Sequence, residues 1–223
     1  MNRRATVQEL APAPSLTDRA YAEIEEMIVT LRLAPGSAVS ESELSGLLGI
    51  GRTPIREALQ RLARERLVAI FPRRGIFVTD INVASQLRLL ETRRELERLI
   101  ARSAARRATA DERDRFRALA AAFEAAAKAN DDVTFMRIDR DFNVLCSAAS
   151  HNEFAAGAMS LMHSLSRRFW YLHYKQAADM PQTAKLHADI ARAIAAGDEE
   201  RAAKASDRLL NLIEKFTRST VSP

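Results

Sequence analysis

The distribution of glycine and proline constrains the fold of this chain more than any other feature of its sequence. Between residues 81 and 223 the only such residues are Gly157, Pro181, Gly197 and the terminal Pro223. Because glycine and proline are the residues that most often interrupt helices, helices are expected to fill this part of the chain. The sequence therefore predicts a mainly α protein.

Short polar breaks divide residues 81–223 into helical segments. The predicted helices span about 82–108, 111–129, 132–149, 152–176, 181–196 and 198–218. Helices of this length that are joined by short turns pack beside one another in antiparallel pairs. We expect an all-α antiparallel helical bundle over residues 81–223.

The preceding segment, residues 17–80, begins with two helices. Helical spacing of apolar residues starts near Thr17 and ends at Pro35-Gly36, a pair that forms turns. The run Ser40-Glu41-Ser42-Glu43 has the pattern of a capping box. It predicts a second, short helix, which Gly49 is placed to close.

A third helix and a hairpin follow. Thr53 stands directly before Pro54 and is expected to cap the third helix, which places Arg56 at its third position. The segments 67–71 and 75–79 have the composition of two short strands joined by a tight turn. The order helix, helix, tight turn, helix, hairpin is that of a winged helix-turn-helix.

Positive charge is concentrated in one short window. The chain has a net charge of +5, and residues 51–75 account for all of it with seven arginines against two glutamates. Two local acids cannot pair seven guanidinium groups. Because the third helix and the hairpin are the parts of a winged helix-turn-helix that meet a duplex, the cluster predicts binding to double-stranded DNA.

We assign the DNA contacts to both of these parts. The predicted DNA-binding residues are Arg52, Thr53, Arg56, Arg73, Arg74 and Gly75. Those on the third helix are expected to reach base edges and nearby phosphates, and those at the wing tip to approach the sugar-phosphate backbone. The alternative for Arg56 is an ion pair on the protein's own surface with Glu41, Glu43 or Glu57.

Other classes of protein are not expected. A single cysteine, Cys146, excludes an internal disulfide and a cysteine-rich zinc site. No stretch approaches about 18 consecutive apolar residues, and the first residues lack the apolar core of a secretory signal. There is no glycine-rich phosphate loop, nucleophile elbow or HExxH motif. We therefore expect a cytoplasmic protein that is neither an enzyme nor bound to a membrane.

The motifs within residues 35–78 resemble a known family. They are Pro35-Gly36, Glu43-Leu44, the run LGIGRTPIREALQRL at 48–62, Leu67-Val68 and the run PRRGIFV at 72–78. These motifs resemble the DNA-binding domain of GntR-family transcriptional regulators, and the helical remainder is similar to the FadR-type, or FCD, effector domain. The resemblance implies a homodimer that binds a short palindromic operator and is released or retuned by a small metabolite.

FCD domains commonly hold a divalent metal through an aspartate and a histidine four residues apart, with one histidine from each of two later helices. Asp139 matches the aspartate and His187 matches one later histidine, but Asn143 and Leu209 stand at the other two positions. One aspartate and one histidine make a poor transition-metal site. The sequence favours the absence of a metal, with Asp139 and His187 as a degenerate site that otherwise forms a buried pair or faces water.

The same resemblance implies a ligand pocket. Arg93 lies where FCD proteins place an arginine on the first effector helix, and a guanidinium can hold a carboxylate in two places. Together with Asp139, Asn143 and His187 it outlines the predicted effector site. The alternative for Arg93 is a pair with Glu97, four residues further on, on a solvated face.

These observations lead to one functional prediction. Residues 1–16 are expected to form a flexible arm, residues 17–80 the winged helix-turn-helix domain, and residues 81–223 the effector and dimerisation domain. We expect a sequence-specific repressor of transcription whose affinity for its operator changes when a small metabolite, most simply a carboxylate, binds. The alternative keeps the DNA-binding fold but gives it a helical domain that only dimerises. The aromatic residues within 169–174 are expected to pack in a core or a dimer interface.

Overall fold

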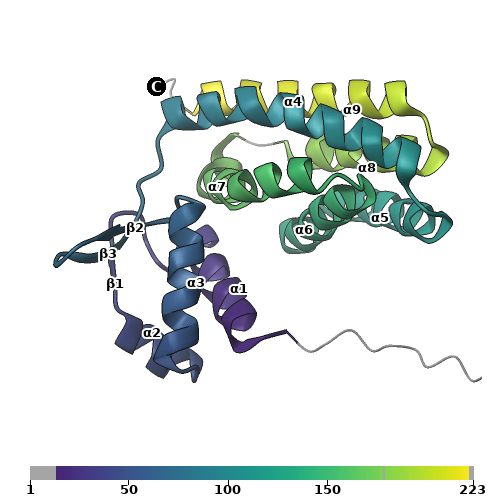
Figure 1. Cartoon of the computed structure of the whole chain (residues 1–223). Helices are drawn as coiled ribbons and strands as arrows, with labels where there is room; N and C mark the ends of the chain where they lie inside the picture. The colour runs from purple at the N-terminus through teal and green to yellow at the C-terminus, as the bar shows by residue number, and fades with distance from the viewer. Residues whose placement is uncertain (1–13, 178, 221–223) are drawn as a thin grey trace, which may run out of the picture.

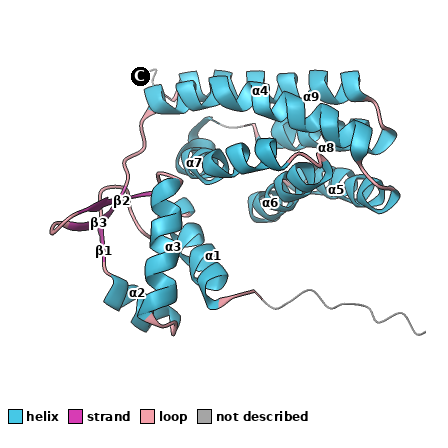
Figure 2. Cartoon of the chain, viewed as in Figure 1, coloured by secondary structure: helices cyan, strands magenta, loops and turns pink. Residues whose placement is uncertain are grey.

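The computed structural model describes residues 14–177 and 179–220, and helices dominate it (Figure 2). The helices are α1 (Leu16–Val29), α2 (Glu41–Leu48), α3 (Arg52–Arg64), α4 (Val83–Arg107), α5 (Ala110–Ala129), α6 (Asp132–Ala149), α7 (Glu153–Ala177), α8 (Met180–Ala196) and α9 (Glu199–Ser219). The strands are β1 (Ala38–Val39), β2 (Val68–Phe71) and β3 (Gly75–Val78). The prediction of a mainly α fold is confirmed. None of the described helices is long and apolar enough to cross a membrane.

The first three helices and the small sheet enclose one apolar core. On α3 the large buried side chains are Ile55, Leu59 and Leu62, which recur at helical spacing on the helix that packs against α1. On α1 they include Ile24 and Ile28, both fully buried. Each such side chain contributes roughly 1.5–3 kcal/mol through removal from water, so α1 and α3 are held together as one unit.

The start of α3 differs from the prediction. Ser40 caps α2 as expected, accepting a hydrogen bond from the Glu43 backbone N–H. The helix α3, however, begins at Arg52, and its N-cap is Gly51, which has no side chain to accept a hydrogen bond. The prediction of Thr53 as the cap was therefore wrong, and Arg56 is the fifth residue of the helix rather than the third. The cation in the first turn, which opposes the helix dipole, is Arg52.

The sheet contains a strand that the sequence did not predict. Its order is β1-β3-β2, with both neighbouring pairs antiparallel. β1 is two residues long and pairs Ala38 with Phe77 and Val39 with Ile76. The hairpin of β2 and β3 lies within one residue of the predicted strands. This hairpin projects from the small domain as the wing (Figure 1).

The six predicted helices beyond residue 81 are α4 to α9, and each boundary lies within one residue of its prediction. α4 and α9 run side by side along one edge of the bundle (Figure 1). Ion pairs connect them, among them Arg98 with Asp207 at 2.8 Å and Arg94 with Glu214 at 3.1 Å. α8 packs between α9 and α5, and α6 and α7 complete the bundle around a second apolar core.

Within the bundle, α7 is the helix that packs against α1 of the N-terminal part of the chain (Figure 1). Arg168 of α7, which is 3% exposed, donates hydrogen bonds to the Thr79 carbonyl oxygen at 2.8 Å and to the Asp80 carbonyl oxygen at 3.3 Å. The connection from β3 to α4 is only four residues long and ends at Asn82, which caps α4. Most of the predicted arm, residues 1–16, lies outside the described residues.

Candidate nucleic-acid interface and effector cavity

All six residues predicted to contact DNA are exposed. Arg52, Thr53 and Arg56 lie within the first two turns of α3. Arg73 and Arg74 lie in the turn between β2 and β3 and Gly75 begins β3, at the tip of the projecting wing (Figure 1). The small domain therefore presents the arginine cluster on the two parts that a winged helix-turn-helix brings to a duplex.

Side chains of α2 hold the two arginines of α3. The Arg56 guanidinium donates from Nε and Nη2 to the Glu41 carboxylate at 3.0 and 2.9 Å, and Arg52 Nη2 donates to Ser42 Oγ at 3.1 Å. The hydrogen bond from Arg56 lowers the pKa of Glu41. The ion pair expected as the alternative for Arg56 is thus present, but 62% of the Arg56 side chain stays exposed. An exposed pair of this kind contributes little stability, so Arg56 can exchange Glu41 for another hydrogen-bond acceptor.

The wing tip has an unusual backbone. Arg73 has φ of 63° and Gly75 has φ of 107°, both in the region that favours glycine. The Arg74 backbone N–H donates to the Phe71 carbonyl oxygen at 3.1 Å, which closes the turn. A left-handed arginine costs about 1–3 kcal/mol and is most common at functional sites. The turn thus holds two guanidinium groups at the end of the hairpin.

Arg61 connects α1 to α3. Its guanidinium carbon lies 3.7 Å from the centre of the Tyr21 ring, and its Nε contacts Glu65 Oε1 at 3.4 Å. The Tyr21 hydroxyl also donates to Glu65 at 2.7 Å. Burial of Tyr21, together with this hydrogen bond, raises the pKa of Tyr21. These contacts join α1 to the end of α3.

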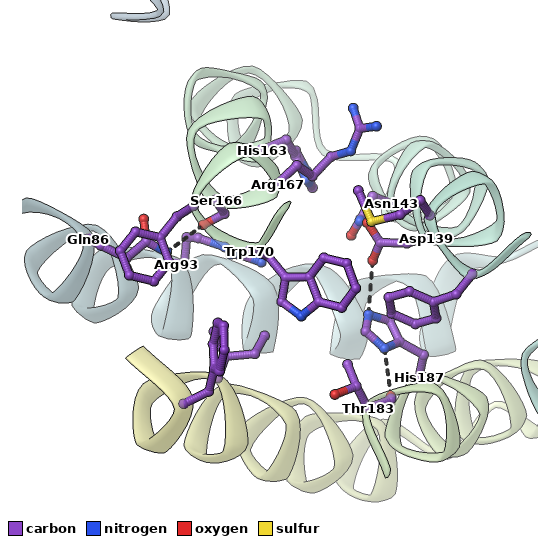
Figure 3. Close-up of a pocket in the computed structure, with 15 residues that line it drawn as sticks. Gln86, Arg93, Asp139, Asn143, His163, Ser166, Arg167, Trp170, Thr183 and His187 are labelled. Carbon is purple, nitrogen blue, oxygen red and sulfur yellow. Dashed lines mark hydrogen bonds and ion pairs between the residues drawn. The ribbon is translucent and has the colours of Figure 1, made fainter. Parts of the chain in front are cut away.

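The helical bundle contains two adjoining cavities that share several lining residues. Arg93, Asn143, His163 and His187 line both of them. They come from α4, α6, α7 and α8 in turn, so four helices contribute a polar group to one place (Figure 3). The sequence predicted three of these residues.

His187 and Asp139 form a buried pair. His187 Nε2 lies 3.1 Å from Asp139 Oδ1, and His187 Nδ1 lies 2.8 Å from the Thr183 carbonyl oxygen (Figure 3). Burial raises the pKa of the Asp139 carboxyl, but the hydrogen bond and charge of His187 outweigh it, and the net shift is downward. The His187 ring also stacks on Phe123 with centroids 4.9 Å apart. The pair is therefore rigid.

Arg93 forms the predicted pair with Glu97, with its Nε donating to Glu97 Oε1 at 2.7 Å. The prediction of a solvated face was wrong, since Arg93 is only 7% exposed and lines the cavities. Glu97 lines the second cavity beside it. The guanidinium is thus placed where a ligand would meet it.

Several cavity residues were not assigned to the effector site from the sequence, and three of them lie on one helix. His163, Arg167 and Trp170 lie on α7 and follow one another at helical spacing, so they share one face. Burial, with a smaller effect of Arg93, lowers the pKa of His163 to about 4. Trp170 packs against the core as expected, and it also lines the first cavity and stacks on Tyr174. The helical spacing was the signal that identifies this face.

The donor set does not fit a transition metal. Both ring nitrogens of His187 already have partners, Asp139 and the Thr183 carbonyl. Asn143 offers one amide oxygen, and Leu209, which lines the second cavity, has no donor atom. Within residues 14–177 and 179–220 no group of three His, Cys, Asp or Glu side chains is arranged to hold a metal ion. The functions proposed for this chain do not depend on a metal.

A winged helix-turn-helix with an exposed arginine cluster, joined to a helical bundle with an internal polar cavity, defines a DNA-binding regulatory protein. Family models agree with this description: "Bacterial regulatory proteins, gntR family" matches residues 16–78, and "FCD domain" matches residues 88–212, more than half of the chain. The chain belongs to the GntR family and carries an FCD domain. It is a transcriptional regulator and not an enzyme.

Individual relatives are distant along most of the chain. The HTH-type transcriptional regulator YdfH of Escherichia coli O6:H1 is 25% identical over 210 residues, covering 94% of this chain and 92% of its own. A regulator from Streptomyces ambofaciens is 48% identical over 64 residues, 29% of this chain and 27% of its own. Escherichia coli McbR/YncC has the same fold, with a TM-score of 0.81, 17% identity, and coverage of 94% of this chain and 100% of its own.

Proposed function

We propose that α3 and the wing bind an operator, with Arg52, Thr53 and Arg56 near base edges and Arg73, Arg74 and Gly75 on the sugar-phosphate backbone. The exposure of all six residues on the part of the chain that carries its whole net charge supports this assignment. Guanidinium groups can make paired hydrogen bonds to guanine, whereas contacts to phosphate carry no sequence information directly. Mutations in the two groups of residues should therefore affect DNA binding in different ways.

The test uses an operator selected from random duplexes and a random-sequence duplex of equal length. Arg56→Ala is expected to lower the ratio of the two affinities by about 5- to 150-fold, the range of one lost base contact. Arg73→Ala should weaken both complexes equally and reduce the salt dependence. Neutralisation of five phosphates corresponds to a slope of log K on log salt near about −4.5. Arg115→Ala, an exposed arginine on α5, is the control. Equal losses on both duplexes for both variants would contradict the assignment.

We infer that the cavity of the FCD domain binds a small carboxylate that changes operator affinity. The observation that carries this inference is the convergence of four polar side chains from four helices on one cavity inside the bundle. A core that only supports dimerisation has no need of a buried arginine, because burying polar groups costs free energy unless they are satisfied. The polar cavity thus favours a sensor over the alternative of a dimerisation scaffold.

Trp170 lines the cavity and is the only tryptophan of the chain, so its fluorescence can report on ligand binding. A panel of small carboxylates is screened by Trp170 fluorescence and by thermal shift, where a ligand at 100 times its Kd adds about 2.7 kcal/mol. Arg93→Gln is expected to abolish binding. Arg94→Gln, the adjacent arginine that pairs with Glu214 outside the cavity, should leave binding unchanged. No response from any carboxylate, or equal behaviour of the two variants, would refute the proposal.

We further propose that the chain is a homodimer and a repressor. Repression is supported by the HTH-type transcriptional repressor RspR of Escherichia coli K12, which is 24% identical over 210 residues. Dimerisation is supported by large apolar side chains left exposed in the bundle, such as Phe154 at 81% and Val144 at 62%. Light scattering of the Phe154→Ser protein tests the homodimer. A reporter gene placed behind the selected operator tests repression.

A further inference from the structure

Arg167 belongs to the effector cavity and to the contact between the two halves of the chain at the same time. It lines the first cavity from α7, beside His163 and across from Thr183 and His187 (Figure 3). Its Nη1 donates to Glu25 Oε1 of α1 at 3.0 Å. The side chains of Arg167 and Glu25 are 18% and 6% exposed, so this ion pair is largely removed from water.

The positive charge of Arg167 acts inside the cavity. It contributes to the low pKa of Asp139 and to the low pKa of His163, which lie on different helices. In addition, Arg167 Nε is buried and has no hydrogen-bond partner. The guanidinium therefore has one face committed to Glu25 and a donor left over for another acceptor.

Glu25 depends on Arg167. It is a 5% exposed carboxylate, and it accepts a hydrogen bond from the guanidinium of Arg167. The nearby carboxyl of Glu65 is an unfavourable neighbour, since the charge of Glu25 raises its pKa. A buried carboxylate that loses the cation paired with it is strongly destabilised, so Glu25 must then move toward water.

We propose that Arg167 is a further anion-binding residue of the cavity and the residue that couples the cavity to the DNA-binding domain. A carboxylate in the cavity and the carboxylate of Glu25 compete for the same guanidinium, so ligand binding and docking of α1 on α7 oppose each other. This inference rests on the proposed function, because it needs an anionic ligand in the cavity. Competition of this kind is a direct form of allosteric linkage.

A movement of α1 reaches the recognition helix. α1 packs against α3 through the apolar core, and Thr17 of α1 donates to Glu57 of α3 at 2.7 Å. The pair of Arg61 and Tyr21 adds a second link. Because packed helices move as rigid bodies, release of Glu25 turns α1 and α3 together. Arg168, the next residue after Arg167, stays hydrogen-bonded to the Thr79 carbonyl, so α1 and α3 rotate about this contact.

The experiment measures carboxylate binding and operator binding in Glu25→Gln, Arg167→Gln and the double variant, with succinate as the probe. Glu26→Gln is the matched control, since it removes the same charge from the same helix at an exposed position. Because Glu25→Gln removes the competitor, it is expected to bind succinate about 5- to 20-fold more tightly than the wild type, within the usual range of allosteric coupling. Without succinate, its operator affinity should equal that of the succinate-saturated wild type.

Several results would overturn the inference. Equal succinate affinity in the wild type and Glu25→Gln would exclude competition. Effects of Glu25→Gln and Arg167→Gln on operator affinity that simply add in the double variant would exclude the ion pair as the coupling element. The proposed function fails in a different way: neither the wild type nor Glu25→Gln then responds to succinate or to any other carboxylate of the panel. Non-additive effects on operator affinity would still support the Glu25–Arg167 connection in that case.

Discussion

The contribution of the Arg168 hydrogen bonds to the junction between the two domains can be tested by Arg168→Met. This substitution keeps the length of the side chain and removes its charge. Arg168 donates to the Thr79 carbonyl at 2.8 Å, the Thr79 hydroxyl at 3.1 Å and the Asp80 carbonyl at 3.3 Å. Burying the charged guanidinium of Arg168 also costs free energy. Burial lowers the pKa of Arg168 to about 10, and its Nε is buried with no hydrogen-bond partner.

The two effects can be compared. A shift of the Arg168 pKa from 12.5 to about 10 corresponds to roughly 3 kcal/mol of unfavourable burial, at about 1.4 kcal/mol per pKa unit. Three hydrogen bonds from a charged donor contribute about 1.5–3 kcal/mol each. The bonds therefore outweigh the burial, and their loss also leaves buried carbonyl groups without a donor. We expect Arg168→Met to lower the free energy of unfolding by about 2–4 kcal/mol.

Urea unfolding followed by circular dichroism measures this loss. Arg137→Met is the matched control, because Arg137 is exposed on α6 and its replacement should change stability by less than about 0.5 kcal/mol. An Arg168→Met protein as stable as the wild type, or more stable, would refute the reasoning. It would mean that the buried charge is a net cost and that the hydrogen bonds only offset it.

Three further outcomes are expected. Glu41→Gln releases Arg56 and should raise operator affinity about 2- to 5-fold in fluorescence anisotropy, whereas Glu43→Gln on the same helix should not. Gly75→Ala forces alanine to φ of 107° and should lower the free energy of unfolding by about 1–3 kcal/mol in urea titrations. Burial lowers the pKa of His163 to about 4, so the unfolded chain binds a proton that the folded chain does not. Stability should thus fall as the pH drops from about 6.5 to 4, and a pH series of unfolding measurements on His163→Gln should lack this loss of roughly 3 kcal/mol.

The helices were predictable because their signals are local. Apolar residues at helical spacing and polar breaks lie within a few residues of each other, and all six helices of the bundle were found within one residue. The start of α3 was missed because Thr53 before Pro54 is a stronger capping signal than Gly51, while the tight turn after α2 requires the helix to begin sooner. β1 was missed because two residues carry no periodicity.

The polar contacts inside the bundle depend on tertiary structure and were predicted only in part. Arg93, Asp139, Asn143 and His187 came from the family resemblance, and the structure brings them to one cavity system. Arg167 was not singled out, because its partner Glu25 lies 142 residues away and neither residue belongs to a motif. Pairs of this kind are set by how helices pack, which no local pattern records.

The concentration of charge in residues 51–75 gives the chain an electric dipole moment as well as a net charge. In the field of a duplex such a molecule rotates during its approach, so that the wing and α3 arrive first. A small molecule inside the bundle changes neither the number nor the location of these arginines. We therefore expect it to leave the rate of encounter almost unchanged and to act on the lifetime of the complex instead.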